Sequence, residues 1–207
     1  MKKNATHFGP VSSISCAANR SIVATCSSDD VTVRVWEYSP LRQVLTHNCH
    51  HAPLAIGIDP WGRELVVCYV DCCRCYSIVE GSLLEVSQMM LETPFGPEEM
   101  TKCCMVKYTP TGHLIAVVGG DRCKDVVIFS TLSHKPLATL HGHFSPIVDI
   151  AWSADGLLLT TVRSSFLFCC TMLCIPRTPP TPALLIAIAP PSVHLSFVWM
   201  LLFASGG

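Results

Sequence analysis

Short runs in which apolar and polar residues alternate make up most of this 207-residue chain. In residues 31–38, for example, a valine stands at every second position up to Val35, which is the period of a half-buried β-strand. Comparable apolar runs occur at 21–26, 42–47, 64–70, 72–78, 83–90, 113–120, 125–131, 135–140 and 157–162. The pattern predicts an all-β chain with no helix of more than two turns.

Turn-like segments punctuate these runs at regular intervals. They read "AANR" (17–20), "DPWG" (59–62), "TPTG" (109–112) and "SADG" (153–156), and three of them end in glycine, which supplies the positive φ of a tight turn. Grouping the runs around these turns gives three units of nearly four strands each. A fourth unit ends after two strands.

One phrase occurs twice in the chain. "HFGPVSSI" begins at His7 and "HFSPIVDI" begins at His143, so the two copies are 136 residues apart. That interval holds three units of about 45 residues, the repeat length of four-stranded propeller blades. The spacing therefore indicates a partial β-propeller of about three and a half blades.

The stretch "TCSSDDVTVRVWEY" (25–38) resembles the second half of a repeat in the WD-repeat β-propeller family, with Trp36-Glu37 where the family has Trp-Asp. Gly142-His143 resembles the Gly-His pair at which the family's repeat opens, and Thr6-His7 is a variant of that pair. The resemblance implies that each blade is fixed by a hydrogen-bonded tetrad of a histidine, a hydroxyl, an aspartate and a tryptophan. A buried polar chain of this kind fixes geometry only when every member has a partner.

Carried residue by residue onto this chain, the first blade's structural tetrad comprises His7, one of the hydroxyls of Thr25, Ser27 or Ser28, then Asp30 and Trp36. His143 is the second histidine at which a blade starts. The second and third units depart from the pattern, because Tyr76 and Phe129 replace the tryptophan and no clear Gly-His pair precedes them.

The succession of these units along residues 5–162 also resembles the large WD-repeat proteins of cilia and flagella. That resemblance implies a non-catalytic scaffold that binds other proteins within a larger assembly. Axonemal and dynein-arm components are the partners it implies. The location expected is cytoplasmic, at the axoneme of a cilium or flagellum.

Composition changes abruptly near residue 163. Residues 164–207 contain no Asp, Glu or Lys, and the single formal charge is Arg177. We expect residues 5–162 to form the partial propeller and residues 163–207 to be an unrelated, Pro-rich apolar tail that is disordered, spurious or a weak membrane segment. Because three and a half blades do not close a ring, we expect the chain to be either a piece of a longer propeller or a poor folder on its own.

Two alternative functions follow from other features. Residues 183–204 are long enough to span a bilayer and would tether a propeller module, although Pro190-Pro191 interrupts them. The first alternative is therefore a membrane-tethered module. We favour the scaffold over it, with no membrane partner.

The second alternative is a metal- or thiol-dependent enzyme. "HNCHH" offers His47, Cys49, His50 and His51 as ligands, and "CCRC" places Cys72 and Cys75 at Cys-x-x-Cys spacing. Adjacent residues of a strand point apart, and no helix start is present to activate a thiol, so we predict loop residues and buried apolar cysteines instead.

Net charge and cysteine content bear on the remaining classes of function. A net charge of −1 gives no electrostatic footprint for nucleic acid. The 13 cysteines are read as reduced thiols. We predict no catalytic residues, no cofactor and no resident metal.

Overall fold

The computed structural model describes residues 6–91, 103–119, 123–141 and 143–163, together with the strands at 171–174, 185–188 and 200–201. These residues form four antiparallel sheets and contain no α-helix. The predicted all-β fold, built from four-stranded units, is confirmed.

Within the first three sheets the strands pair in chain order. The first sheet comprises β1 (Ser13–Cys16), β2 (Ile22–Ser27), β3 (Thr32–Tyr38) and β4 (Leu41–Asn48). The second comprises β5 (Ala55–Ile58), β6 (Glu64–Cys68), β7 (Cys73–Val79) and β8 (Ser82–Met89). The third comprises β9 (Met105–Tyr108), β10 (Leu114–Gly119), β11 (Asp125–Ser130) and β12 (Pro136–Leu140).

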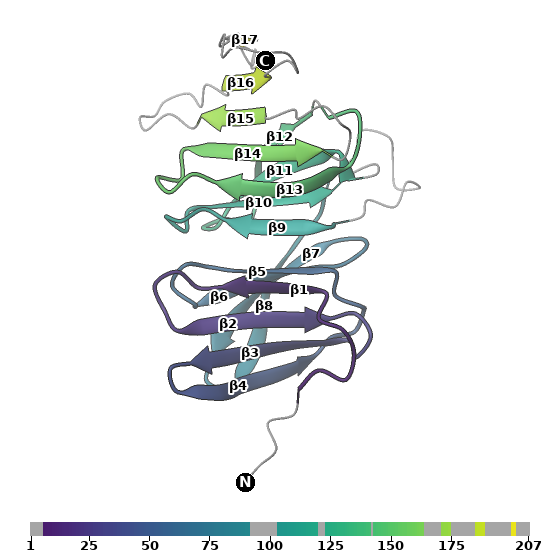
Figure 1. Ribbon diagram of the computed structural model, residues 1–207, viewed down its shortest axis with the longest axis vertical. Helices are drawn as coiled ribbons and strands as arrows, with labels where there is room; N and C mark the ends of the chain where they lie inside the picture. Colours follow the sequence, from purple (N-terminus) through teal and green to yellow (C-terminus); the bar gives the residue numbers. More distant parts are fainter. Residues whose placement is uncertain are drawn as a thin grey trace.

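The sheets follow one another along the long axis of the molecule, with the first two in the lower half of Figure 1 and the last two in the upper half. Their first strands are neighbours, because β1 lies against β5, β5 against β9, and β9 against β13 (Ile147–Trp152). Successive sheets therefore meet face to face around a common line of inner strands, the arrangement of propeller blades.

Alternation within the strands explains how the sheets pack. In β6, Leu65 and Val67 join a buried cluster between the first and second sheets, whereas Val66 and Cys68 join another between the second and third. The strand β10 behaves in the same way between the third and fourth sheets. Both faces of the middle sheets are thus buried, which is why these strands read as nearly continuous apolar runs.

The predicted turns lie side by side on one face of the arc. The Asn19 amide donates to the Pro60 carbonyl at 2.8 Å, and so joins the first turn to the second. A Cβ built on Gly112 would lie 3.4 Å from Pro60 Cδ, and one built on Gly156 would lie 3.4 Å from Thr111 Oγ1, so the later turns also touch. These glycines have φ of +72° and +71°, and so meet both needs at once.

The fourth sheet differs from the expectation that its unit stops after two strands. After β13, β14 (Leu158–Arg163) pairs with β15 (Thr171–Cys174), and pairing continues through β16 (Leu185–Ile188) to β17 (Met200–Leu201). Without such pairing β14 would be an edge with open backbone donors and acceptors, which any extended segment can satisfy.

The remainder of residues 163–207 lies outside the described residues, and the domain boundary at 163 stays a prediction. Most of the proposed membrane segment, 183–204, also lies outside them. Across the part of the chain that is described, no helix has the length and apolarity to cross a bilayer.

The inter-sheet core yields a direct test. Phe129, fully buried between the second and third sheets, should cost about 3–5 kcal/mol of unfolding free energy when changed to alanine. Phe144, which is 87% exposed, is the matched control and should change the free energy by less than about 0.5 kcal/mol. Urea denaturation measures both, and equal effects would contradict the stacking of the sheets.

Candidate functional site

A chain of side-chain hydrogen bonds lies on the face of the first sheet that turns away from the second. Trp36 Nε1 donates to Thr25 Oγ1 at 2.9 Å, and the same Oγ1 lies 2.9 Å from His7 Nε2. His7 Nδ1 lies 2.9 Å from Asp30 Oδ2. One consistent assignment has the Thr25 hydroxyl donating to Nε2 and Nδ1–H donating to the carboxylate, so that each group has a distinct role.

Asp30 is where several of these bonds converge. It accepts from the Phe8 amide at 3.0 Å, from the Thr32 amide at 3.2 Å and from the Thr32 hydroxyl at 2.7 Å, besides His7. Burial opposes ionisation of this carboxyl, but the hydrogen bonds from Thr32, His7 and the Phe8 amide outweigh burial and hold its pKa below the ordinary value. The backbone conformation that places it is costly, since Val31 has a φ of 53°.

Of the three candidate hydroxyls, the structure brings Thr25 to His7 and Trp36. Ser28 instead donates to the Pro53 carbonyl at 2.8 Å, and the buried Ser27 hydroxyl has no hydrogen-bond partner among the described residues. Sequence alone could not choose between them, because Thr25 and Ser27 lie on the same face of β2.

The second copy of the repeated phrase makes a matching contact. His143 Nε2 lies 2.6 Å from Thr161 Oγ1, and both residues are buried. The pair is separated by 18 positions, as are His7 and Thr25. The recurrence of the phrase thus corresponds to recurrence of one hydrogen bond between a sheet's entry loop and its second strand.

The middle sheets keep the geometry and change the chemistry. A β-bulge immediately precedes Trp36, Tyr76 and Phe129 in the three sheets, so these aromatic residues occupy corresponding positions. The Tyr76 hydroxyl lies 3.2 Å from the Tyr69 hydroxyl, whereas Phe129 offers no polar group at all. Only the first of these three positions carries the indole that links a histidine network.

The two sequence-based metal and thiol candidates do not assemble. The His47 ring packs 5.3 Å from the Tyr76 ring, and the His51 ring packs 6.4 Å from the Tyr69 ring. Among the described residues, Cys49 and His50 join no group of three metal-ligating side chains.

The Cys-x-x-Cys pair is divided between two cores. Cys72 packs between the first and second sheets, whereas Cys75 packs between the second and third. Burial raises the pKa of both thiols. Two thiols on opposite faces of one sheet cannot act as a redox pair.

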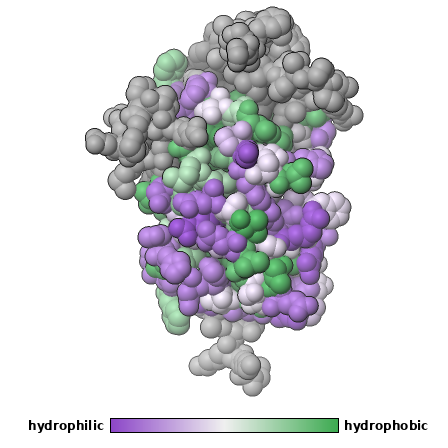
Figure 2. Space-filling view, turned by 180° about the vertical axis from the view of Figure 1, so that it is seen from behind, coloured by the Kyte–Doolittle hydropathy of each residue, from purple (hydrophilic) through white to green (hydrophobic). Residues whose placement is uncertain are grey.

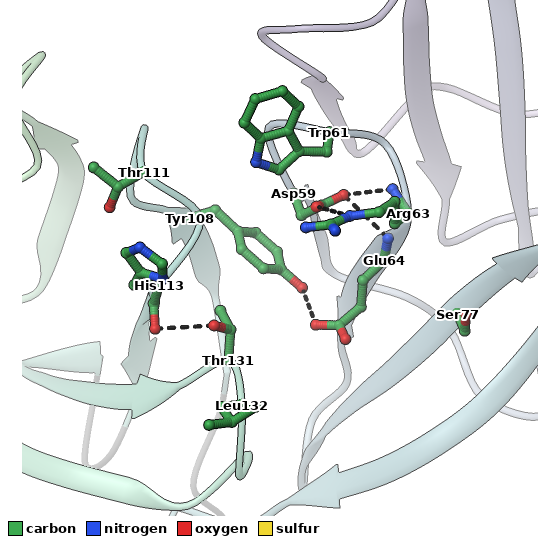
Figure 3. A pocket seen from close by; sticks show the side chains of 11 residues that line it. Asp59, Trp61, Arg63, Glu64, Ser77, Tyr108, Thr111, His113, Thr131 and Leu132 are labelled. Carbon is green, nitrogen blue, oxygen red and sulfur yellow. Dashed lines mark hydrogen bonds and ion pairs between the residues drawn. The ribbon is translucent and has the colours of Figure 1, made fainter.

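A surface pocket of about 500 Å³ lies between the second and third sheets, at the face where the turns meet. Figure 3 shows its walls, where the Tyr108 hydroxyl points to Glu64, and Arg63 to Asp59. Trp61 at its rim is 51% exposed. Sequence reasoning missed this pocket because its residues come from turns about 50 and 70 positions apart, and only packing brings them together.

The lining mixes polar groups with exposed apolar side chains. It consists of Asp59, Trp61, Arg63, Glu64, Ser77, Tyr108, Thr111, Gly112, His113, Thr131 and Leu132. Such a combination is typical of surfaces that recognise a protein segment.

Comparison with known proteins shows which repeat the units resemble. The profile of the WD40 family (WD domain, G-beta repeat) matches residues 2–37 and 134–170. These two stretches are therefore similar to WD40 repeats. Both matched stretches contain one copy of the repeated phrase, and the first contains the whole network of His7, Thr25, Asp30 and Trp36. The middle sheets, in which the tryptophan is replaced, lie mostly outside the matches.

The curated relatives that the chain matches have names that refer to cilia. The chain is 24% identical over 149 residues to cilia- and flagella-associated protein 57 of Mus musculus, covering 72% of this chain and 11% of that protein. It is 23% identical over 156 residues to cilia- and flagella-associated protein 57 C of Tetrahymena thermophila, covering 74% and 12%. A 59-residue stretch is 37% identical to the ciliary WD repeat-containing protein ctxp80 of Euplotoides octocarinatus, covering 28% and 8%.

The chain therefore spans about a tenth of the length of the relatives that it matches. The similarity to the first two extends over most of the chain at modest identity. The WD-repeat, cilium-related resemblance of the sequence is confirmed.

We expect the hydrogen-bond network of the first sheet to act as one structural unit. Trp36→Ala should cost about 3 kcal/mol of unfolding free energy, at the lower end for tryptophan because the side chain is partly exposed. Asp30→Ala should cost about 1–3 kcal/mol, because it leaves buried donors without an acceptor. Since both belong to one network, the double variant should cost clearly less than the sum.

Asp29→Ala is the matched control for Asp30, since the neighbouring carboxylate is exposed. It should change the unfolding free energy by less than about 0.5 kcal/mol. Urea denaturation of the four variants measures the cycle. Additive losses, or a larger effect at Asp29 than at Asp30, would contradict the network's role.

Proposed function

We propose that this chain is a non-catalytic scaffold module that binds other proteins in the cilium or flagellum. The observation that carries the proposal is the combination of WD40 repeats with the exposed Trp61 at the rim of a rigidly built pocket. The ciliary names of the curated relatives support the location.

The pocket face is suited to a protein partner. Tryptophan is enriched among the few residues that dominate binding energy at protein interfaces. Leu132, which also lines the pocket, is 94% exposed, and the ion pair of Arg63 with Asp59 supplies polar groups. On the face seen in Figure 2, by comparison, apolar groups form small patches bordered by hydrophilic side chains.

The face is also held rigid, and a rigid binding surface loses less entropy when it binds. The Gly62 amide donates a hydrogen bond to the Asp59 carbonyl at 3.0 Å, and the Gly112 amide donates one to the Thr109 carbonyl at 2.9 Å, so each turn is closed. Side chains reinforce the same turns, because Asp59 Oδ1 accepts from the Arg63 amide at 2.6 Å and Thr109 Oγ1 accepts from the Leu114 amide at 3.1 Å.

The finer part of the proposal is an axonemal role. The relatives are named as associated with cilia and flagella, and a WD40 module of this kind would connect components of the axoneme, including dynein arms. In this role the module supplies a binding face, and it contributes no reacting group.

Co-sedimentation of the purified full chain with demembranated axonemes tests the proposal. We expect saturable binding that Trp61→Ala weakens about 30-fold, which corresponds to a hot-spot loss of about 2 kcal/mol. Phe8→Ala is the control, because Phe8 is 92% exposed and is not part of the pocket lining. Absence of saturable binding would contradict the ciliary role, and equal weakening by both variants would contradict the pocket as the binding face.

A further inference from the structure

Three side chains with metal-ligating atoms meet between the second and third sheets, beside the pocket. They are Glu64 at the start of β6, Cys75 in the middle of β7, and His134 in the turn between β11 and β12. Each offers one ligand atom, and the three atoms lie within 4.8 Å of one another. Cys75 is 59 positions and Glu64 is 70 positions before His134 in the sequence, so only the stacking of the sheets brings them together.

The distances in this cluster suit a tetrahedral zinc site. Cys75 Sγ lies 3.4 Å from His134 Nε2, and Nε2 lies 3.3 Å from Glu64 Oε2. Zinc bonds of about 2.0–2.1 Å to nitrogen or oxygen and about 2.3 Å to sulfur place neighbouring tetrahedral ligand atoms about 3.3–3.6 Å apart. These two separations match two edges of such a tetrahedron, and the third pair of atoms lies within 4.8 Å.

Each of the three groups is held in place by its surroundings. Cys75 is fully buried within a sheet, where it pairs with Val66 on one side and with Ser87 on the other. The His134 backbone has a φ of 53°, and its amide donates to the Ser130 carbonyl at 2.9 Å. A non-glycine residue in this conformation is uncommon, and here it directs the imidazole toward the thiol.

An outer partner and an access route are also present. The Tyr108 hydroxyl donates to Glu64 Oε1 at 2.9 Å, and so orients the carboxylate in the way that outer-shell groups orient metal ligands. Glu64 and Tyr108 both line the pocket (Figure 3), so the cluster borders solvent on that side.

We propose that Glu64, Cys75 and His134 bind a zinc ion that links the second sheet to the third, with water in the fourth position. The thiol loses its proton to solvent as the sulfur–zinc bond forms, and the imidazole binds through Nε2 while Nδ1 keeps its proton. Because a thiol must be deprotonated to bind zinc, metal uptake should release a proton and weaken as pH falls. This inference is independent of the proposed ciliary role.

Metal titration of the purified full chain tests the proposal. The chain is kept reduced, treated with chelator, and then given zinc or cobalt(II). We expect one equivalent of zinc per chain, a thiolate-to-cobalt charge-transfer absorption, and a thermal midpoint that rises with zinc because the metal binds only the folded sheets.

Variants separate this site from binding by other thiols. Cys75→Ala, His134→Asn and Glu64→Gln should each weaken zinc more than about 100-fold, beyond the roughly 10- to 100-fold loss expected for the outer-shell change Tyr108→Phe. Asparagine suits position 134 because it tolerates a positive φ. Cys72→Ala is the matched control, since that buried cysteine faces the other core, and it should leave zinc binding unchanged.

Circular dichroism tests whether each variant retains the β fold. If Cys75→Ala does not, His134→Asn and Glu64→Gln decide the question alone. Zinc binding far below one equivalent in the unmodified chain, or equal binding by His134→Asn, Glu64→Gln and Cys72→Ala, would overturn the proposal.

Discussion

Burial of both faces of the second and third sheets is the constraint on which this structure depends. A sheet whose residues alternate between two apolar faces cannot be stable in water until each face meets another sheet. Leu65 and Val66 are neighbours in β6, yet they belong to different cores. Each middle sheet is therefore held by the sheets before and after it, and the row of touching turns, the pocket and the Glu64–Cys75–His134 cluster exist only because of that stacking.

The side-chain hydrogen bonds differ from one sheet to the next. In the first sheet, His7 and Trp36 share the Thr25 hydroxyl, and in the fourth, His143 reaches Thr161. The second sheet replaces such a chain with a pair of tyrosine hydroxyls, and the third has a phenylalanine at the corresponding position. The same backbone position, marked by a bulge, thus accepts polar or apolar aromatic residues.

Much of the fold could be predicted from sequence because strand alternation and glycine turns are local signals. The runs at 21–26 and 64–70 fall on β2 and β6, and "TPTG" forms the turn between β9 and β10. The features that could not be predicted depend on residues far apart in the chain. The choice of Thr25 over Ser27 depends on where the His7 ring lies, and the pairing of β14 with β15 has no local motif to announce it.

The pocket and the proposed metal site were beyond sequence reasoning for the same reason. The sequence spacing pairs Cys75 with Cys72, although the two lie on opposite faces of the second sheet. Its spatial partner is His134, from a turn in the next sheet. Residues that are far apart in the chain become one site only when two sheets stack.

Hydrogen exchange followed by mass spectrometry tests the stacking most directly. If the second and third sheets are buried on both faces, amides in β6 and β10 should exchange only through global unfolding, and much more slowly than amides in β8, which is largely exposed. Exchange in β6 and β10 as fast as in β8 would contradict the account, because it would mean that burial of both faces does not protect these strands from local opening.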